Sequence, residues 1–396
     1  MSFSRTLDNP KKVELEHLPK KTDIEIHGHT GNWKNSHSLV LPPMNRFGGQ
    51  IRSKPQSGFN QSTLINNQGQ LDFHLNSAGY VEKLFMEMEI TVSNNPVTII
   101  PHYLIDRIEL FASEGNIIST IYGDNIYAQK IHKTLEQHNR EKSVENLSSG
   151  YDGVAIAVGS KRIVLHIPTF IDGSHLKLNV IKSKLVARVY FSNLGVTAGL
   201  ASDISVTLCD IIQHGAQLAP QLESLENKRK GNSALWFRFL NPVRVASQTI
   251  AMVASNNYDI RLTSANNLSA YLMFVIRAAP LTTSNINTFQ AVDYFELLDS
   301  DNTVVGIKTS NEYHKILTQH FQGDIFNYKN IYVVPFALSV ESSNNGSQTG
   351  LYAFTSNEIL RVYMPSTLVG GSYRVDVYSF DYNKLKLENG NLDVSK

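Results

Sequence analysis

Two stretches of the chain, 101–127 and 291–314, are loose copies of one another in a single gapless register. The register keeps a constant offset of 187 residues, which is the difference between 293 and 106. The matched pairs are Asp106 with Asp293, Glu109 with Glu296, Leu110 with Leu297, and Ile117-Ile118 with Val304-Val305. Each copy reads as a strand, a polar turn, a second strand and then a helix that carries tyrosine and isoleucine. The chain is therefore predicted to contain two versions of one β-rich unit.

The length and composition fit a duplicated unit. With 396 residues, the chain is too long for one ordinary core and long enough for two domains of roughly 200 residues or fewer. Its 42% of hydrophobic residues can fill two cores. The 36 Lys and Arg residues nearly balance the 35 Asp and Glu residues. No net field therefore draws the chain to nucleic acid, to a membrane surface or to an acidic substrate.

The sequence holds one cysteine, Cys209, which excludes an intramolecular disulfide and a cysteine-based zinc site. It lies in the apolar run 206–212, where we expect it to be a small buried hydrophobic residue. A chain stabilised by packing alone suits a reducing compartment. The N-terminus has no apolar core of a signal peptide, and no run approaches the roughly 20 apolar residues of a membrane span.

Four segments are predicted: an N-terminal arm with a lead-in segment (1–65), a first β unit (66–218), a connector (219–234) and a second β unit (235–396). The arm is polar and of mixed charge, so we expect it to become ordered against a neighbour. Its His27 and His29 lack a third ligand and are expected to be polar loop residues. The connector carries Pro220, Gly231 and a basic cluster at 228–230 that is too short to indicate nucleic acid binding.

Short strands and long polar loops dominate both units. The first unit contains the runs 71–75, 81–92, 185–191 and 206–212, and Phe85 is expected to face the core. Nothing resembles the parallel alternation of strands and helices of an α/β protein. The predicted fold class is all-β, with two tandem sandwiches of Greek-key or jelly-roll winding and short helices in the loops.

One helix is predicted after the second strand of each repeat. The first lies within 123–142 and has a narrow apolar stripe of Tyr127, Ile131 and Leu135. The second lies within 310–321, with a capping box formed by Thr309 and Glu312. Its apolar stripe is Tyr313, Ile316, Leu317 and Phe321.

The search for catalytic chemistry finds no nucleophile elbow, dinucleotide fingerprint, P-loop, zincin motif or EF-hand loop. The recurring carboxylates Asp106 with Glu109, and Asp293 with Glu296, lie three residues apart on a strand and should point to opposite faces. They are expected to fix turns at strand ends. The helical pairs His132/His138 and His314/His320 have a spacing of six, which is poor for a shared ligand. We therefore predict no catalytic, cofactor-binding or metal-binding residues.

The segment 101–129 resembles the first-domain signature of the double jelly-roll major capsid proteins of tailless icosahedral double-stranded DNA viruses. This lineage includes adenovirus hexon, large eukaryotic DNA viruses and membrane-containing tailless phages. Three further segments resemble that family in the expected order: 167–191, 349–364 and 372–394. The resemblance covers most of the chain from Leu71 onward, whereas the N-terminal arm has no match. The loops are shorter than those of the eukaryotic members, which favours a compact, bacteriophage-like member.

The resemblance implies a structural protein and not an enzyme. Its fold would be all-β, with two tandem eight-stranded jelly-roll sandwiches that stand side by side. Three copies would form a pseudo-hexagonal capsomer that tiles an icosahedral shell, commonly over an internal membrane. The implied partners are two further copies in a homotrimer, neighbouring capsomers, and minor capsid and vertex proteins. The implied location is the virion, after assembly inside the host cell. No cofactor and no specific nucleic acid binding are implied.

Two other classes of function remain open. A receptor-binding or carbohydrate-binding β-sandwich, such as a spike, would present a groove lined by exposed aromatic residues. The tyrosines at 122, 127, 294 and 313 are instead expected to lie in strand and helix cores. A sandwich-fold hydrolase would need a nucleophile or metal cluster that the sequence does not display.

Overall fold

The structure is a computed structural model, and the description below is confined to the residues whose placement it defines. These are 46–53, 55, 69–76, 80–92, 97–99, 101–112, 115–131, 154–156, 158–172, 176–178, 181, 184–192, 204–218, 235–282, 285, 288–322, 329–338, 350–388 and 391–395. Most of the expected N-terminal arm and the whole expected connector lie outside these residues.

The described strands up to residue 218 form the first unit, which has two main sheets. One has the order β1 (Arg46–Ser53), β11 (Ile204–Leu218), β3 (Tyr80–Val92) and β8 (Gly159–Ile167), with β9 (Leu176–Lys177) also on β3. The other has the order β2 (Gln70–His74), β10 (Leu185–Phe191), β5 (Ile105–Ala112) and β6 (Ile117–Tyr122). The remaining elements are the small sheet of β4 (Val97–Ile99) with β7 (Val154–Ile156), the turn η3 (Pro101–Leu104) and the helix α5 (Gly123–Ile131).

The strands from residue 235 onward form the second unit. Its first sheet has the order β12 (Leu235–Met252), β20 (Gly371–Glu388), β14 (Leu268–Ala278) and β17 (Tyr332–Pro335), with β18 (Tyr352–Ala353) on β14 and β21 (Asn391–Ser395) on β20. Its second sheet has the order β13 (Asn257–Arg261), β19 (Ile359–Tyr363), β15 (Tyr294–Leu298) and β16 (Thr309–Ser310). The helix α9 (Asn311–Gln322) follows β16 directly.

Both units wind in the same way. When the eight main strands of each unit are taken in chain order, one sheet runs first, eighth, third, sixth and the other runs second, seventh, fourth, fifth. The pairings within both units are antiparallel. This is the winding of a jelly roll. The predicted fold class of two tandem jelly-roll sandwiches is confirmed.

The domain boundaries at 65, 218 and 235 stay a prediction. The strand β1 lies inside the segment 1–65, yet it is hydrogen-bonded to β11 over its whole length, from Arg46 with Leu218 to Ser53 with Ile211. At least the end of the expected arm and lead-in segment therefore contributes a sheet strand to the first unit.

Alternate side chains along each strand point into the space between the two sheets of a sandwich and fill it. On β10, Ala187 and Val189 are fully buried, while Arg188 and Tyr190 point away from the core. Phe85 was expected to face the core, and this prediction is wrong. It lies on the outer face of β3, where its ring packs against those of His166, at 5.4 Å, and His214, at 6.5 Å.

The sequence repeat extends further than the segments that first reveal it, because the same offset of 187 carries Asp72 to Asp259. Both β10 and β19 contain the tripeptide Arg-Val-Tyr. Arg188 donates two hydrogen bonds of 2.7 Å to the Asp72 carboxylate. Arg361 donates two, of 2.6 and 2.8 Å, to the Asp259 carboxylate. In register beside these arginines stand the two matched glutamates, Glu109 and Glu296. The outer faces of the two second sheets thus carry the same charge pattern.

The polar turn of each repeat is also conserved in conformation. Gly115 and Asn302 occupy matched positions, and both have positive φ, of 94° and 58°. The second strand expected at Val304-Val305 is wrong, since Val304 makes only an isolated bridge to Leu298 and the strand β16 comes later.

The capping box expected from Thr309 and Glu312 is also wrong. Ser310 is the N-cap of α9, and its Oγ accepts the Tyr313 N–H at 3.2 Å. Thr309 instead belongs to β16, where it pairs with Phe295 of β15.

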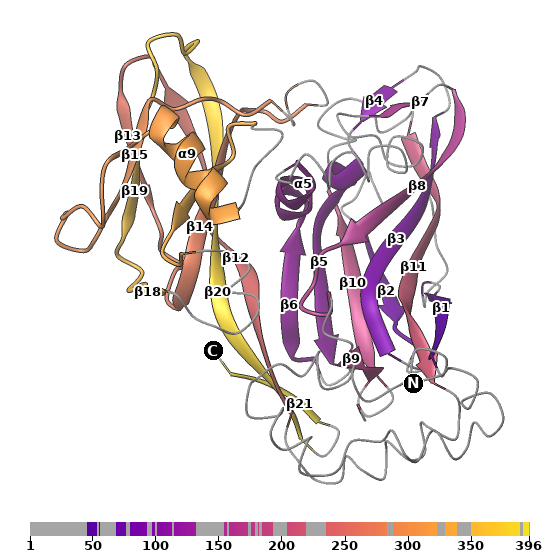
Figure 1. Ribbon diagram of the computed structural model, residues 1–396. Coiled ribbons are helices and arrows are strands. Elements are labelled where there is room, and N and C mark those ends of the chain that lie inside the picture. Colours follow the sequence, from indigo (N-terminus) through magenta and orange to yellow (C-terminus); the bar gives the residue numbers. More distant parts are fainter. Residues whose placement is uncertain are drawn as a thin grey trace, which may run out of the picture.

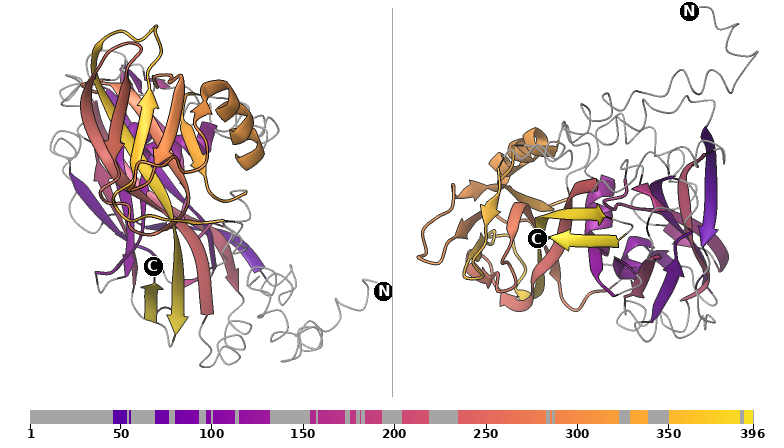
Figure 2. Two further views of the ribbon diagram at one scale, coloured as in Figure 1. Left: turned by 90° about the vertical axis from the view of Figure 1, so that its left-hand side faces the viewer. Right: turned by 90° about the horizontal axis from the view of Figure 1, so that it is seen from below.

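The two sandwiches stand side by side (Figure 1). The edge of the first unit formed by η3, β6 and α5 faces the outer side of the second unit's sheet of β12, β20 and β14 (Figures 1 and 2). Beyond the second sandwich, β12 and β20 continue as a long ribbon with β21, on the side where the C-terminus lies (Figure 1). Phe239 of this ribbon packs on Phe170 of the first unit, with ring centroids 5.1 Å apart.

Candidate functional site

The recurring carboxylates do not form a catalytic pair. Asp106 and Glu109 were expected to point to opposite faces of their strand, and this expectation is wrong for the first unit. The register slips between Tyr190 and Phe191, so that Asp106 is an extra residue in β5. Both carboxylates therefore reach Arg107, Asp106 at 3.1 Å and Glu109 at 2.8 Å. Each is held in an ion pair.

The second pair is separated along the sheet. Glu296 is buried and accepts a hydrogen bond of 2.7 Å from the Tyr363 hydroxyl. Asp293 precedes β15, and its backbone carbonyl accepts the Asn311 N–H at 3.0 Å where α9 begins. The turn-fixing role expected of the Asp293 side chain stays a prediction, because this contact uses the backbone.

The histidine and cysteine candidates within the described residues do not gather into a metal site. His27, His29, His132 and His138 lie outside the described residues. His314 is fully buried in α9, where its Nε2 lies 2.8 Å from the backbone nitrogen of Val333. Within the described ranges, no three His, Cys, Asp or Glu side chains gather as a metal site would require. Cys209 is buried as expected, and burial raises the pKa of its thiol far above the ordinary value.

The most unusual polar feature is a buried ion cluster at the junction of the two units. Arg277 of β14 donates to both carboxylate oxygens of Asp124 in α5, at 2.8 and 2.9 Å. Its Nη2 also donates to Asp376 of β20 at 2.7 Å. The side chains are 3%, 6% and 0% exposed in the order Arg277, Asp124, Asp376. Asp124 belongs to the first unit and the other two to the second.

Neighbouring side chains complete the cluster. The Tyr378 hydroxyl donates to Asp124 at 2.6 Å, the Ser247 hydroxyl to Asp376 at 2.7 Å, and Arg374 to Asp376 at 2.9 Å. Two carboxylates thus face two guanidinium groups and two hydroxyls, and the three side chains at the centre, Arg277, Asp124 and Asp376, are buried. A buried charge cluster of this kind is tolerable only because every charge has a partner.

The cluster holds two of its members, Asp376 and Arg277, in their charged forms. Burial alone would raise the pKa of Asp376, but the charges of Arg277 and Arg374 and the Ser247 hydrogen bond outweigh it, so the pKa lies below the ordinary value. Burial would likewise lower the pKa of Arg277, but the carboxylates of Asp124 and Asp376 raise it. Both groups are therefore charged at neutral pH.

This charge state predicts an acid-dependent loss of stability. A carboxyl group in the unfolded chain titrates near pH 3.9, and the pKa of Asp376 is lower in the folded protein. Its contribution is therefore complete above about pH 4 and is lost as the pH falls through the folded pKa. We expect urea unfolding to show a falling free energy below about pH 4. Asp376→Asn should remove part of that slope, and an unchanged slope in this variant would contradict the assignment.

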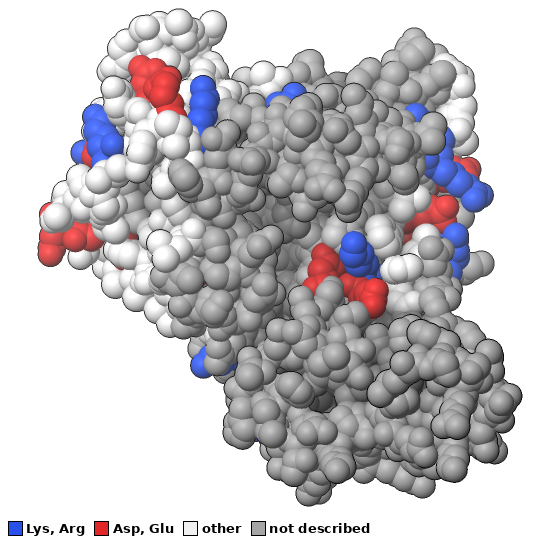
Figure 3. All heavy atoms as spheres, in the orientation of Figure 1, with Lys and Arg blue, Asp and Glu red and all other residues white. Residues whose placement is uncertain are grey.

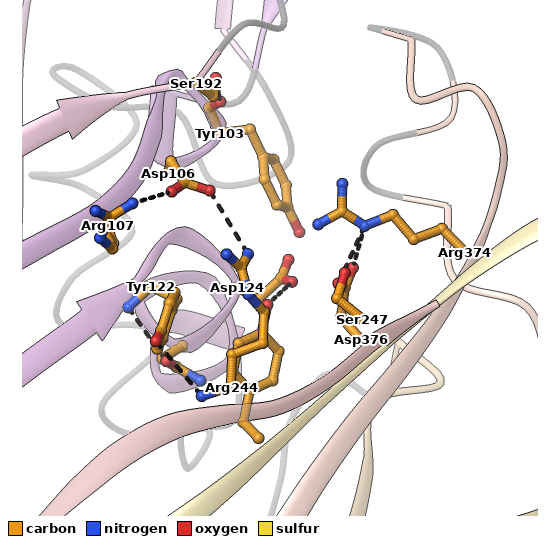
Figure 4. A network of polar contacts seen from close by, with 12 residues as sticks. Tyr103, Asp106, Arg107, Tyr122, Asp124, Ser192, Arg244, Ser247, Arg374 and Asp376 are labelled. Carbon is orange, nitrogen blue, oxygen red and sulfur yellow. Dashed lines mark hydrogen bonds and ion pairs between the residues drawn. The ribbon is translucent and has the colours of Figure 1, made fainter. Parts of the chain in front are cut away.

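A cavity of about 620 Å³ opens beside the cluster. Residues of both units line it, and Tyr103 and Arg374 point toward one another across it (Figure 4). Arg244 of β12 lies 3.6 Å from Asp106 and stacks on the Tyr122 ring at 5.0 Å. The charged groups of the lining are thus engaged with one another. These contacts hold the two sandwiches together.

Other contacts across the junction are apolar or backbone-directed. The Thr120 N–H donates to Asn241 Oδ1 at 3.0 Å, and the Tyr122 ring lies 5.2 Å from that of Tyr378. Tyr127 of α5 packs against Phe289 at 5.9 Å. A single hydrophobic cluster contains buried residues of both units. The junction is therefore a continuous core.

The sequence contained only a weak signal for this site. Asp124 was visible as an acidic residue in the first turn of a predicted helix. Arg277 directly follows the apolar run 271–276. A lone arginine at the end of a buried strand indicates a buried partner. Nothing in the sequence pairs residues that are 153 positions apart.

The described surface carries no large area of one charge on the face seen in Figure 3, where acidic and basic side chains form small mixed groups. Among the described helices, none is long and apolar enough to cross a membrane.

No protein-family model matches the sequence. No curated protein sequence matches it either. The search of solved structures, in contrast, finds 77 matching chains.

Three of the similar structures are viral capsid proteins. VP54 of PBCV-1, fitted into a reconstruction of the virophage Sputnik, aligns with a TM-score of 0.68 and 13% identity over 89% of this chain and 97% of VP54. The Faustovirus major capsid protein aligns with a TM-score of 0.57 and 8% identity over 97% and 99% of the two chains. The major capsid protein of Sulfolobus turreted icosahedral virus aligns with a TM-score of 0.51 and 10% identity over 85% and 96%.

At identities this low, the structural alignments establish a shared fold, and the function has to be argued separately. A tandem carbohydrate-binding module aligns only with a TM-score of 0.18, which carries no argument for the sugar-binding alternative. The alignments above span nearly the whole of each capsid protein, and both jelly rolls of this chain are included in them. In fold, the chain is a double jelly-roll protein of the kind found in the major capsid proteins of icosahedral DNA viruses.

Proposed function

We propose that this chain is a viral major capsid protein, which assembles as a trimer into a pseudo-hexagonal capsomer and tiles an icosahedral shell. The observation that carries the proposal is the pairing of two jelly rolls of identical strand order, locked together by a buried ion cluster. The solved structures of this fold that resemble the chain are capsid proteins by their own descriptions.

The architecture supports a threefold assembly with a near-sixfold outline. Two similar but unequal units in each chain supply six sandwiches when three chains close a ring. The rigid junction keeps the two units of one chain at a fixed mutual orientation. Balanced charge allows many like subunits to pack closely without strong repulsion.

The proposed partners follow from this role: two further copies, neighbouring capsomers, and minor capsid and vertex proteins. The proposed location is the shell of the virion, after assembly in the host cell. Two finer proposals are that the virus is bacteriophage-like and that the shell encloses an internal membrane. The chain would act without a catalytic step, as a building block.

The alternative of a receptor-binding or carbohydrate-binding sandwich depended on where four tyrosines lie. Tyr127 is fully buried and Tyr122 half-buried at the junction, as expected for core residues. The expectation is wrong for Tyr294 and Tyr313, which are 44% and 45% exposed. Neither lines the cavity at the junction.

Light scattering coupled to size exclusion tests the proposal. The full chain should elute as one species with three times the 44.3 kDa of a single chain. A monomer that binds glycans on an array would overturn the capsid proposal in favour of the alternative.

Deleting residues 1–40 is expected to spare the trimer and impair shell assembly. The described strands begin at residue 46, so the deletion removes no strand of the part of the chain that the structure describes. A polar segment of this kind gains order from neighbouring subunits. Light scattering would report the trimer and electron microscopy the shells. Loss of the folded trimer would show that the arm belongs to the capsomer itself.

A further inference from the structure

The cavity at the junction holds more hydrogen-bond donors than the described residues around it use. Its volume is about 620 Å³, and residues of both units line it. Four of the lining residues are arginines: Arg107, Arg244, Arg277 and Arg374. Arg107 and Arg277 are each bonded to two carboxylates of the chain. The donors of the other two arginines are used much less.

Arg374 of β20 uses one of its three guanidinium nitrogens. Its Nε lies 3.0 Å from one oxygen of Asp376 and 2.9 Å from the other. The two terminal nitrogens, Nη1 and Nη2, form no hydrogen bond within the part of the chain that the structure describes. The side chain is 32% exposed and points toward Tyr103 across the cavity (Figure 4). Both terminal nitrogens are therefore available to a ligand.

Arg244 of β12 is the second underused donor. Its guanidinium group lies 3.6 Å from Asp106, which suits an ion pair but is too long for a hydrogen bond. The same group stacks on the Tyr122 ring at 5.0 Å. Among the described residues, none accepts a hydrogen bond from it. Its N–H groups can therefore also bind a ligand in the cavity.

Two buried donors of the lining also lack a partner. The Tyr103 hydroxyl and the Nε of Arg277 form no hydrogen bond with any described residue, and these residues are only 4% and 3% exposed. Burial and the nearby charge of Asp124 raise the pKa of Tyr103 well above its ordinary value, so the hydroxyl keeps its proton and can donate. Buried donors without partners are unfavourable, and in a cavity they indicate a bound molecule that accepts hydrogen bonds.

The charges of the lining favour an anion. Four guanidinium groups line the cavity together with two carboxylates, those of Asp106 and Asp124. Both oxygens of Asp124 are already bonded, and Asp106 is paired with a neighbouring arginine. Two further carboxylates balance the count, but Glu109 and Asp376 do not line the cavity. The positive charge therefore lies on the side of the cavity.

We propose that this cavity binds a phosphate group, either of free phosphate or of a small organic phosphate, whose oxygens accept hydrogen bonds from Arg244, Arg374 and Tyr103. The planar fork of arginine donors matches the oxygens of a phosphate group. The volume is within the range of about 300–1,000 Å³ that is typical of small-molecule sites. It leaves room for an organic remainder beside the apolar part of the lining, Ala279, Pro280 and Leu281.

The ligand would bridge the two units, because Tyr103 belongs to the first unit and the two arginines belong to the second. A molecule that binds the folded chain across the junction stabilises it by mass action. Phosphate should therefore raise the Tm above its value in chloride at equal ionic strength. The proposal is independent of the capsid role, which depends on the oligomeric state.

Isothermal titration calorimetry of the full chain at constant ionic strength tests the site. The probes are inorganic phosphate and adenosine monophosphate. We expect one saturable site per chain for at least one of them. Tighter binding of adenosine monophosphate would show that the organic remainder contacts the cavity wall, and equal binding would show that the phosphate group alone is recognised. No saturable binding of either probe up to about 20 mM would overturn the proposal.

Three variants separate the cavity from other basic surfaces. Arg374→Gln and Tyr103→Phe should each weaken binding by about 10-fold or more, because each removes a donor to the phosphate group. Arg361→Gln is the control and should bind as the wild type does, because Arg361 is also bonded to a carboxylate but does not line the cavity.

Circular dichroism should show the native spectrum for all three variants. Tyr103→Phe removes a hydroxyl that has no hydrogen-bond partner among the described residues, so it tests the site even where Arg374→Gln disturbs the fold. Binding that survives unchanged in Tyr103→Phe and in folded Arg374→Gln would place the anion elsewhere on the chain and would overturn the site. The capsid proposal would stand in that case.

Discussion

Replacing Arg277 by leucine should lower the free energy of unfolding by about 3–5 kcal/mol, because it leaves two buried carboxylates without their shared partner. Asp124 would retain the Tyr378 hydroxyl, and Asp376 would retain Ser247 and Arg374. The loss should fall on the junction, since Asp124 and Asp376 belong to different units. Urea unfolding at pH 7 measures it, and hydrogen exchange should show faster exchange in α5 and β14.

Arg361→Leu is the matched control. Arg361 also bonds a carboxylate through two nitrogens, but its side chain is 28% exposed and that of Asp259 42% exposed. Pairs with this much solvent contact contribute about 0–1 kcal/mol. If both variants lowered the free energy of unfolding by the same amount, burial of the ion cluster at the junction would add nothing to the stability. Adding Asp124→Leu to Arg277→Leu should recover part of the stability, because a pair of apolar side chains leaves fewer unpartnered charges.

Truncating Phe274 to alanine should cost about 3–5 kcal/mol, from lost burial and from the cavity left behind. Phe274 is fully buried at the centre of the second sandwich. Its ring stacks on Tyr332 at 4.9 Å and meets Phe295 edge-on at 5.3 Å. Both sheets of the unit are represented in this cluster, so little collapse can fill the space.

Thermal and urea unfolding measure the effect of Phe274→Ala. Val369→Ala, at a side chain that is 78% exposed, should change the stability by no more than about 0.5 kcal/mol. Phe274 belongs to the hydrophobic cluster of the second unit, so the first unit should keep its hydrogen-exchange protection better than the second. Uniform loss of protection in both units would contradict this and would mean that the two sandwiches unfold as one.

Much of the fold could be predicted because the duplication is written into local sequence. Alternation of apolar and polar residues predicted the strands, and the offset of 187 predicted two like units, which the matching strand orders confirm. The polar turns were predictable from residue type. Gly115 and Asn302 are the residue types that tolerate positive φ.

The errors arise where tertiary contacts override a periodic pattern. Phe85 follows the alternation of its strand, but the alternation alone does not say which face is the core. The stripe of Tyr313 and Ile316 looks like a core stripe, yet the helix turns His314 and Thr318 inward instead. The bulge at Asp106 is set by its pairing partner and has no local signature.

The junction was beyond sequence reasoning for a different reason. Asp124, Arg277 and Asp376 are far apart along the chain, and no local pattern indicates that these three residues meet. Only the side-by-side arrangement of the units brings them together.

Electron cryo-microscopy of the purified full chain tests the central claim most directly. We expect particles of three chains whose end view shows six lobes of alternating kind around a threefold axis. Particles of one or two chains, or trimers whose two sandwiches are not arranged in a six-lobed ring, would contradict it.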